Sequence, residues 1–416
     1  MSFDNEMVSN MSVSVRGLKI FGVVGIAALS LAGCAFGGGG AATGTPITVA
    51  AITDSTTSPE VAAAVTGYFN RYNATGGYKG HPLVLTVAEA ADNNDDAAAS
   101  AASDVIGNSS VVALVGSSTA GECAVNSDAY EKADLVSFSA LGQDVFCFTT
   151  PNIAPSNTGP FLDLYAGGWN ALFDGAKKPC AIAIYAQPSS EDAFHQSIDN
   201  LQKITGTAFA SVQVIAQKDD GNYAPEVVSA LTHSCDAMLL SADSATTVSM
   251  ISALIEQGAS IPVYASSAIY NDAFIQAAPV SAYKGLISTP LQFIPVDDAA
   301  NADLDALIAK GFITPASGWV YSNMQAGYLA AQNFIRALDK VDGDVTRDSL
   351  AQAARSDRAW PNEDKMLGNL WAFGPGKTHQ ANTSTFRVDI EPGSGSWTHM
   401  GPWLLATEMK WTDTVR

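Results

Sequence analysis

Short apolar runs alternate with longer helical patterns along most of the chain, and the alternation forms two series. In the first series, apolar runs at residues 47–52, 83–88, 111–115 and 135–139 are separated by helical patterns at 59–72, 94–106 and 120–132. In the second, helical patterns at 160–173, 191–204, 225–232 and 246–257 alternate with apolar runs at 180–185, 211–216, 237–241 and 263–265. Parallel strands need crossover connections, usually helices, so each series predicts a doubly wound parallel sheet. The sequence therefore predicts an α/β protein with two lobes.

Later segments have weaker patterns. Residues 323–338 carry an apolar stripe, which predicts a helix with one buried face. Residues 386–390 alternate like a short strand. The aromatic-rich segment 397–411 gives no structural prediction.

The N-terminus has the parts of a secretory signal. Arg16 and Lys19 are basic, residues 20–31 form a short apolar run, and Leu31-Ala32-Gly33 precede Cys34. This order predicts a lipoprotein signal peptide at 1–33, cleaved so that acyl chains on Cys34 anchor the protein to a membrane. An ordinary signal with an incidental cysteine and a transmembrane anchor are the alternatives.

The residues after Cys34 suggest how the folded part is attached. Residues 34–46 include four successive glycines at 37–40, and such a segment buries too little apolar surface to fold. We expect residues 34–46 to be a flexible tether. The true start is either Met1 or Met11, and Met11 is favoured because residues 1–10 add acidic residues where a signal prefers basic ones.

The net charge of the chain excludes one class of partner. The formal net charge of −20 argues against a nucleic-acid partner, because phosphates require a basic surface.

Cys180 and Cys235 open the first and third strands of the second series, which are neighbours in a doubly wound sheet, so we predict a Cys180–Cys235 disulfide. We predict a second disulfide, Cys123–Cys147, in the first lobe.

Catalytic and metal-binding motifs do not emerge from the sequence. The five His residues form no H-E-x-x-H or Cys/His cluster, so we expect no metal and no cofactor. Residues 374–378 resemble a phosphate loop, but Trp371 stands where its first glycine belongs. The loop at 116–120 lacks the closing glycine of a nucleophile elbow. We therefore expect a binding protein with no catalytic residues.

One turn and several loops carry a family resemblance. Residues 73–85, Asn-Ala-Thr-Gly-Gly-Tyr-Lys-Gly-His-Pro-Leu-Val-Leu, resemble an N-x-x-G-G-I-x-G-x-P turn that leads into the second strand. Weaker matches are residues 115–119, 136–140 and 326–330. In these features the chain resembles the type I periplasmic binding proteins, specifically the branched-chain amino-acid-binding family of ABC transporter components.

The resemblance implies an architecture and a function. It implies a first lobe at residues 46–157 plus 288–380 and a second at 158–287 plus 381–416, joined by a hinge that the chain crosses three times. It also implies an extracytoplasmic, lipid-anchored monomer that captures a small molecule between its lobes and delivers it to an ABC-type permease. A lipid-anchored sensor with the same lobes is the alternative function, and an envelope enzyme is a remote one.

Ligands of open parallel sheets bind beyond the carboxyl ends of the strands. Applied to both lobes, this rule gives the ligand-binding candidates Ser117, Ser118, Thr119, Ser139, Ala140, Leu141, Tyr185, Ser190, Asp243, Ser267 and Tyr270. Hydroxyls and free backbone N–H groups suit a carboxylate or another anionic group. The alternative for residues 117–119 is that they only cap the helix that follows.

The chain departs from amino-acid-binding relatives at three places. Leu141 stands where they carry Thr, residues 186–190 replace their loop after the second lobe's first strand, and no acid lies near Ser267 to hold an ammonium group. Asp243 or Asp272 could substitute for that acid. Tyr185, Tyr270, Phe293, Trp319 and Tyr321 lie near the expected cleft edge, where they either contact a ligand or pack ordinarily. The expected ligand is amino-acid-like, an amide, or an aromatic or carboxylate compound.

Overall fold

The computed structural model describes residues 41–356 and 365–406. The predicted signal peptide and Cys34 lie outside these residues, as does the end of the aromatic-rich C-terminal segment. Among the described residues, no helix has both the length and the apolar character needed to cross a membrane.

The first series of strands forms a four-stranded parallel sheet in the order β2-β1-β3-β4. Its strands are β1 (Ile47–Thr53), β2 (Leu83–Glu89), β3 (Val111–Val115) and β4 (Ser137–Phe138). β1 and β3 lie in the middle and are almost entirely buried, which explains their uninterrupted apolar sequence. β4 is shorter than the predicted run at 135–139.

The Gly-Gly turn between α1 (Pro59–Ala74) and β2 has a clear physical basis. Gly76 and Gly77 have φ values of 112° and 63°, a backbone region that favours glycine. The Asn73 side chain donates to the Leu83 carbonyl and accepts from the Leu83 N–H, both at 2.8 Å. The motif thus fixes how the chain enters the second strand.

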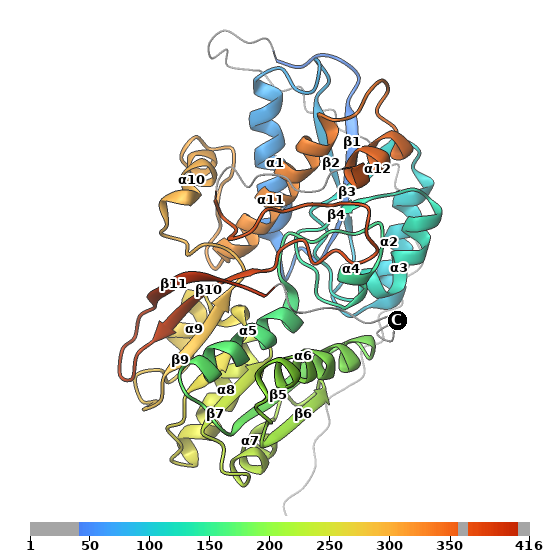
Figure 1. Cartoon of the computed structure of the whole chain (residues 1–416). Helices are drawn as coiled ribbons and strands as arrows, with labels where there is room; N and C mark the ends of the chain where they lie inside the picture. The colour runs from blue at the N-terminus through green and yellow to red at the C-terminus, as the bar shows by residue number, and fades with distance from the viewer. Residues whose placement is uncertain (1–40, 357–364, 407–416) are drawn as a thin grey trace, which may run out of the picture. The chain divides into compact units, whose positions relative to one another are not determined.

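Helices from both halves of the chain surround this sheet, either on the sheet itself or on another helix. They are α1, α2 (Asp95–Gly107), α3 (Glu122–Lys132), α4 (Phe146–Thr149), α10 (Ala302–Ala309), α11 (Tyr321–Leu338) and α12 (Arg347–Ser356). Figure 1 shows α11 beside α1. Gly327 permits this contact, because a Cβ there would lie 2.4 Å from the Val61 carbonyl oxygen.

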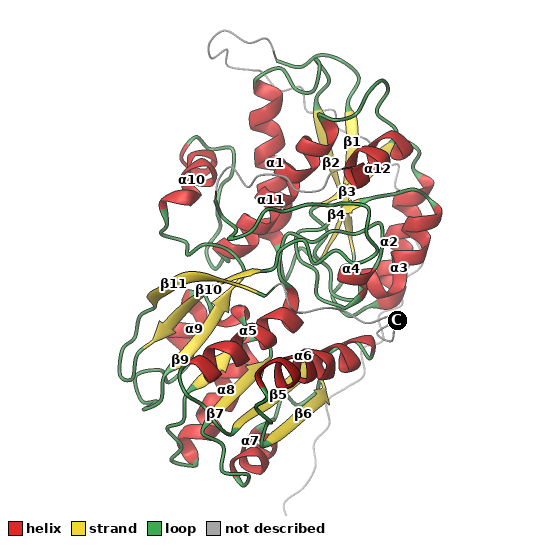
Figure 2. Cartoon of the chain, viewed as in Figure 1, coloured by secondary structure: helices red, strands yellow, loops and turns green. Residues whose placement is uncertain are grey.

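The second series forms a seven-stranded sheet in the order β11-β10-β9-β8-β7-β5-β6 (Figure 2). Its strands are β5 (Pro179–Tyr185), β6 (Ser211–Ala216), β7 (Ala237–Ser241), β8 (Val263–Ala265), β9 (Ile287–Leu291), β10 (Ser384–Ile390) and β11 (Thr398–Leu405). β5 to β9 are parallel, and β10 is antiparallel to both of its neighbours. The sequence patterns do not reveal β9 or β11, because Pro290 and Pro402 interrupt them.

Short and long helices accompany the second sheet. They are α5 (Gly159–Phe173), α6 (Ser189–Thr205), α7 (Ala224–Leu231), α8 (Ser244–Glu256) and α9 (Asp272–Ala277), with 3₁₀ turns η1 (Ser267–Ile269) and η2 (Ala299–Asn301) elsewhere. The mixed α/β fold with parallel sheets and two lobes is the fold class that the sequence predicts.

Side-chain amides tie together the three segments that pass between the sheets. The Asn382 amide donates to the carbonyls of Ser156 and Gln292, at 3.2 and 2.8 Å. Gln380 donates to the Thr158 carbonyl at 2.8 Å, and the Thr158 N–H donates to Oε1 of Gln292 at 3.3 Å. Each crossing is therefore bonded to another, which gives the connection a defined hinge.

Both predicted disulfides are present. Cys180 and Cys235 have Cα atoms 5.7 Å apart, because β5 and β7 are adjacent strands. Cys123 and Cys147 have Cα atoms 5.1 Å apart and join α3 to α4.

Candidate functional site

A cavity of about 480 Å³ lies between the two lobes, beyond the carboxyl ends of strands from both sheets. The first sheet and its helices contribute residues such as Thr57, Asn93, Leu141, Gln143 and Asn323. The second contributes Tyr185, Gln187, Asp243, Ser267 and Tyr270, among others. The position is where the topology of open parallel sheets places a ligand.

The loop after β4 forms one side of this cavity. Oδ1 of Asn157 accepts the Gly142 N–H at 2.7 Å, and its Nδ2 donates to the Gly142 carbonyl at 3.0 Å. Gln143 donates to the Ser118 carbonyl at 2.9 Å. The buried Asn157 thus holds the loop against the first connecting segment, with Leu141 and Gln143 at the cavity.

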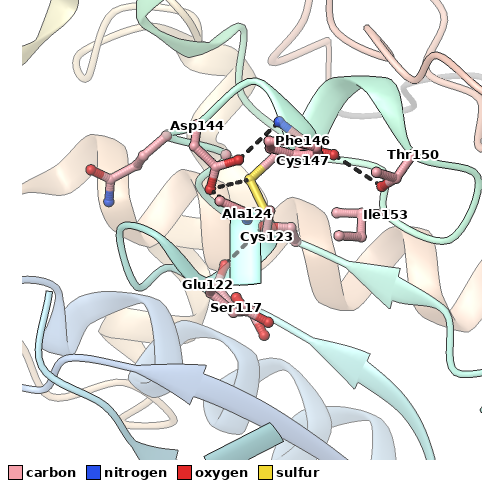
Figure 3. The surroundings of a disulfide bond; sticks show 12 residues. Ser117, Glu122, Cys123, Ala124, Asp144, Phe146, Cys147, Thr150 and Ile153 are labelled. Atoms are coloured by element: carbon pink, nitrogen blue, oxygen red, sulfur yellow. Dashed lines mark hydrogen bonds between the residues drawn. A yellow bond between two sulfur atoms is a disulfide. The ribbon is translucent and has the colours of Figure 1, made fainter. Parts of the chain in front are cut away.

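Asp144 ends that loop beside the first disulfide, as Figure 3 shows. Its carboxylate accepts the N–H groups of Phe146 at 2.8 Å and Ala124 at 3.2 Å. Burial raises the Asp144 pKa to about 6, although these backbone bonds favour the charged form. The two sulfurs near this carboxylate are bonded to each other, so the group Cys123, Asp144 and Cys147 is a disulfide with a neighbouring acid rather than a metal centre.

Glu122 lies on the other side of the same disulfide, near Ser117 (Figure 3). It is 2% exposed and does not line the cavity. Burial raises its pKa to about 8, although its hydrogen bond from Tyr130 favours the charged form. Glu122 therefore lies behind the cavity and supports its wall, rather than lining it.

Asp163 is the main lining residue that the sequence analysis misses. It projects from α5, is 2% exposed, and accepts hydrogen bonds from the Thr158 hydroxyl at 2.7 Å and the Ser267 N–H at 3.1 Å. Ser267 also donates its hydroxyl to Asp163 at 2.5 Å and accepts a bond from Gln292. Burial raises the Asp163 pKa to about 6. Its signal in the sequence is that it is the single charged residue in the apolar stretch 159–173.

The structure brings six of the predicted ligand-binding residues to the cavity: Leu141, Tyr185, Ser190, Asp243, Ser267 and Tyr270. Contacts with neighbouring side chains position two of these residues. The Tyr185 hydroxyl donates to Glu191 at 2.8 Å, and the Tyr270 ring lies 5.3 Å from the Trp397 ring, centroid to centroid. Phe293 also lines the cavity, whereas Asp272, Trp319 and Tyr321 do not.

The other five predicted residues lie behind the cavity wall. Ser117, Ser118, Thr119, Ser139 and Ala140 are at most 3% exposed. The hydroxyls serve the sheet: Ser117 accepts the Ile52 N–H, Thr119 donates to the Ala90 carbonyl, and Ser139 donates to the Ser117 carbonyl. Ser118 shares a 2.7 Å hydrogen bond with Ser58. The alternative that the side chains of residues 117–119 cap the next helix is wrong, because the N-cap of α3 is Gly121, which has no side chain.

Comparison with known proteins supports the fold and the class of site. A family model described as periplasmic binding protein matches residues 46–395. No curated protein matches the chain.

Solved structures share the fold at low sequence identity. A fatty acid ABC transporter substrate-binding protein from Thermomonospora curvata has a TM-score of 0.71 and 18% identity, covering 89% of this chain and 95% of its own. An ABC transporter solute-binding protein from R. palustris in complex with 4-hydroxybenzoate has a TM-score of 0.69 and 14% identity, covering 87% and 97%. An ABC transporter substrate-binding protein from Desulfitobacterium hafniense complexed with Leu has a TM-score of 0.65 and 15% identity, covering 85% and 100%.

These proteins are binding proteins rather than enzymes, and the family works outside the cytoplasm. The match extends over both lobes and the three connecting segments. With its two lobes built on largely parallel sheets and its cavity between them, the chain belongs to the periplasmic binding proteins and has their type I fold.

Proposed function

We propose that the chain is an extracytoplasmic solute-binding lipoprotein that closes its two lobes on a small molecule and presents it to an ABC-type permease. The observation that carries this proposal is that residues from both lobes line the same cavity. A ligand there favours a closed form only if both lobes contact it, since it shifts the equilibrium by its difference in affinity for the two states.

The close approach of the lobes supports such closure. Gly121 in the first lobe faces Gln187 in the second, and a Cβ on Gly121 would lie 2.7 Å from Nε2 of Gln187. Gly121 also has a φ of 90°, which a larger residue rarely adopts. The lobes therefore approach each other closely here, and a Cβ on Gly121 would require the flexible end of the Gln187 side chain to move.

Other features support the lipid anchor and the permease as a partner. The residues around Cys34 fit a lipoprotein signal, and the matched structures are described as parts of ABC transporters. We propose lobes at 46–157 plus 288–380 and at 158–287 plus 381–416, acting as a monomer. Replacing Cys34 with Ala should release the protein or leave the precursor uncleaved, whereas a mature terminus elsewhere by mass spectrometry would exclude the anchor.

Closure is tested by screening small molecules with thermal shift and then measuring small-angle scattering with each molecule that binds. A ligand held by both lobes should stabilise the chain by about 2.7 kcal/mol at 100 times its Kd and reduce the radius of gyration. Gln143→Trp in the first lobe and Ala268→Trp in the second should each weaken binding, because both residues are exposed at the cavity. Lys132→Trp, on exposed α3 surface outside the cavity lining, is the control.

The proposal fails if a tight ligand binds within one lobe. In that case only one of the two cavity substitutions would weaken binding, and the radius of gyration would not change.

A further inference from the structure

The charge of the cavity lining is one-sided. Among the residues that the structure describes, the lining holds the carboxylates of Asp92, Asp144, Asp163 and Asp243 and no Lys, Arg or His. None of these four acids forms an ion pair within the described chain. A bound molecule therefore meets negative charge without a compensating cation.

Each of these acids also accepts a backbone N–H that would otherwise be open to an anionic ligand. Asp92 accepts the Ala120 N–H at 2.8 Å, just before α3, and Asp144 accepts the Ala124 N–H at 3.2 Å, in its first turn. Backbone N–H groups at helix starts are ordinarily a ready site for a carboxylate or phosphate. At α3 the chain supplies its own carboxylates instead.

The second lobe repeats the arrangement. Asp243 caps α8 by accepting the Thr246 N–H at 2.9 Å, and Asp163 accepts the Ser267 N–H at 3.1 Å, at η1. The backbone donors at α3, α8 and η1 are thus occupied by carboxylates from within the chain. A ligand carboxylate would find these donors used and would lie near like charges.

The rest of the lining offers acceptors, amides and apolar surface. Gln187, whose side chain has no hydrogen-bond partner within the described chain, faces the cavity with carboxamides such as Gln143 and Gln217. Phe194, Leu291 and Phe293 supply buried apolar walls. Such a surface suits a molecule with an apolar body and a polar end that donates hydrogen bonds.

We propose that the cavity selects ligands whose polar end is a primary amide or an ammonium group and discriminates against free carboxylates. This inference rests on the proposed function, because it assigns the solute class of that same cavity. It separates the chain from the matched proteins described as binding 4-hydroxybenzoate or transporting fatty acid.

The test uses matched probes on the full mature chain at pH 7.5. Isothermal titration compares 4-hydroxybenzoate with 4-hydroxybenzamide, leucine with leucinamide, and octanoate with octanamide and octylamine, followed by a wider set of acid–amide–amine trios. The amide or amine member should bind at least about ten-fold more tightly than its acid, the ratio that 1.4 kcal/mol of discrimination gives. Asp163→Asn should reduce the preference for amines, and Asp104→Asn, exposed on α2, should leave it unchanged.

A second variant keeps the test valid if Asp163→Asn does not fold. Asp243→Asn preserves the N-cap, since Asn caps helices as well as Asp does, while it removes one of the four charges. Tighter binding of the acids, or binding by acids with no binding by any amide or amine, overturns the inference. Either result leaves the proposed function intact as long as the bound molecule contracts the chain in scattering; absence of any binding removes both.

Discussion

Tyr130 donates a 2.6 Å hydrogen bond from its hydroxyl to Oε1 of Glu122, and both side chains are buried behind the cavity wall. Burial raises the Glu122 pKa to about 8, from 4.5 when it is exposed. As the pH rises from about 4.5 towards 8, the unfolded chain gains the free energy of ionising this acid and the folded chain does not. Glu122 therefore makes the protein less stable at pH 8 than at pH 5.

Glu122→Gln removes this pH dependence and keeps an acceptor for Tyr130. We expect the variant to be more stable than the parent at pH 8 by at least about 1.4 kcal/mol, the equivalent of one pKa unit, and much closer to it at pH 5. Urea unfolding at both pH values measures the difference. Glu131→Gln, exposed on the same helix, is the control and should change neither value. A gain that is equal at both pH values would show that Glu122 is ionised in the fold.

Substituting Arg387 should also lower the unfolding free energy strongly. It lies 2.6 Å from Asp174 and 2.8 Å from Asp389, whose side chain is 1% exposed. Arg387→Met leaves the Asp389 carboxylate buried without its partner, so we expect a loss of about 3 kcal/mol in unfolding free energy. Adding Asp389→Asn should recover part of that loss.

The matched control for Arg387 is Arg71, which lies 2.6 Å from Asp303 in a pair whose side chains are 26% and 41% exposed. Arg71→Met should cost about 1 kcal/mol or less. Equal losses in the two variants would contradict the argument from burial.

The two disulfides should differ in their effect on the site. They span sequence separations of 24 and 55 residues, for which the chain-entropy model gives about 3 to 4 kcal/mol each. The double variants Cys123→Ser/Cys147→Ser and Cys180→Ser/Cys235→Ser should both lower the unfolding free energy by about that amount. Only the first should also weaken ligand binding markedly, because it frees the loop that carries Gln143 and Asp144 to the cavity. Equal loss of affinity in both variants would exclude this role.

The sequence predicts the outline of the fold, because the patterns that indicate its strands and helices lie within short segments. The buried strands β1, β3, β5 and β7 are continuous apolar runs between helical patterns, and the Asn73 to Gly77 turn has its own chemistry. The sequence does not predict β9 or β11, because each contains a proline and gains its place by pairing with neighbouring strands, β9 with β8 and β10, and β11 with β10. The C-terminal segment is thus specified by contacts distant in sequence.

The sequence indicates which loops lie near the site, but not which of their side chains face it. The rule of strand ends selects loops that lie at or next to the cavity, but it cannot tell which side chain turns toward the cavity. Ser117 and Ser139 point into the sheet, whereas Ser267 reaches the cavity from the corresponding place in the second lobe. Asp163 is missed because it comes from a helix, near its N-terminus, rather than from a strand end.

Ser139 provides a direct test of this distinction. Its hydroxyl donates a 3.0 Å hydrogen bond to the Ser117 carbonyl, and the side chain is 1% exposed. Ser139→Ala should cost about 1 kcal/mol of unfolding free energy, the worth of one hydrogen bond, and leave ligand affinity unchanged. Ser139→Leu should cost about 1–3 kcal/mol, because the site has no room for a larger side chain.

Ser267→Ala is the matched variant at the cavity, and it should weaken ligand binding through the loss of its hydroxyl beside Asp163. Denaturation gives the stability of each variant, and titration with a molecule found by the screen gives its affinity. If Ser139→Ala instead weakened binding ten-fold without a loss of stability, its hydroxyl would contact the ligand in the closed form, as the strand-end rule alone predicts. Unchanged affinity would assign Ser139 to the support of the sheet.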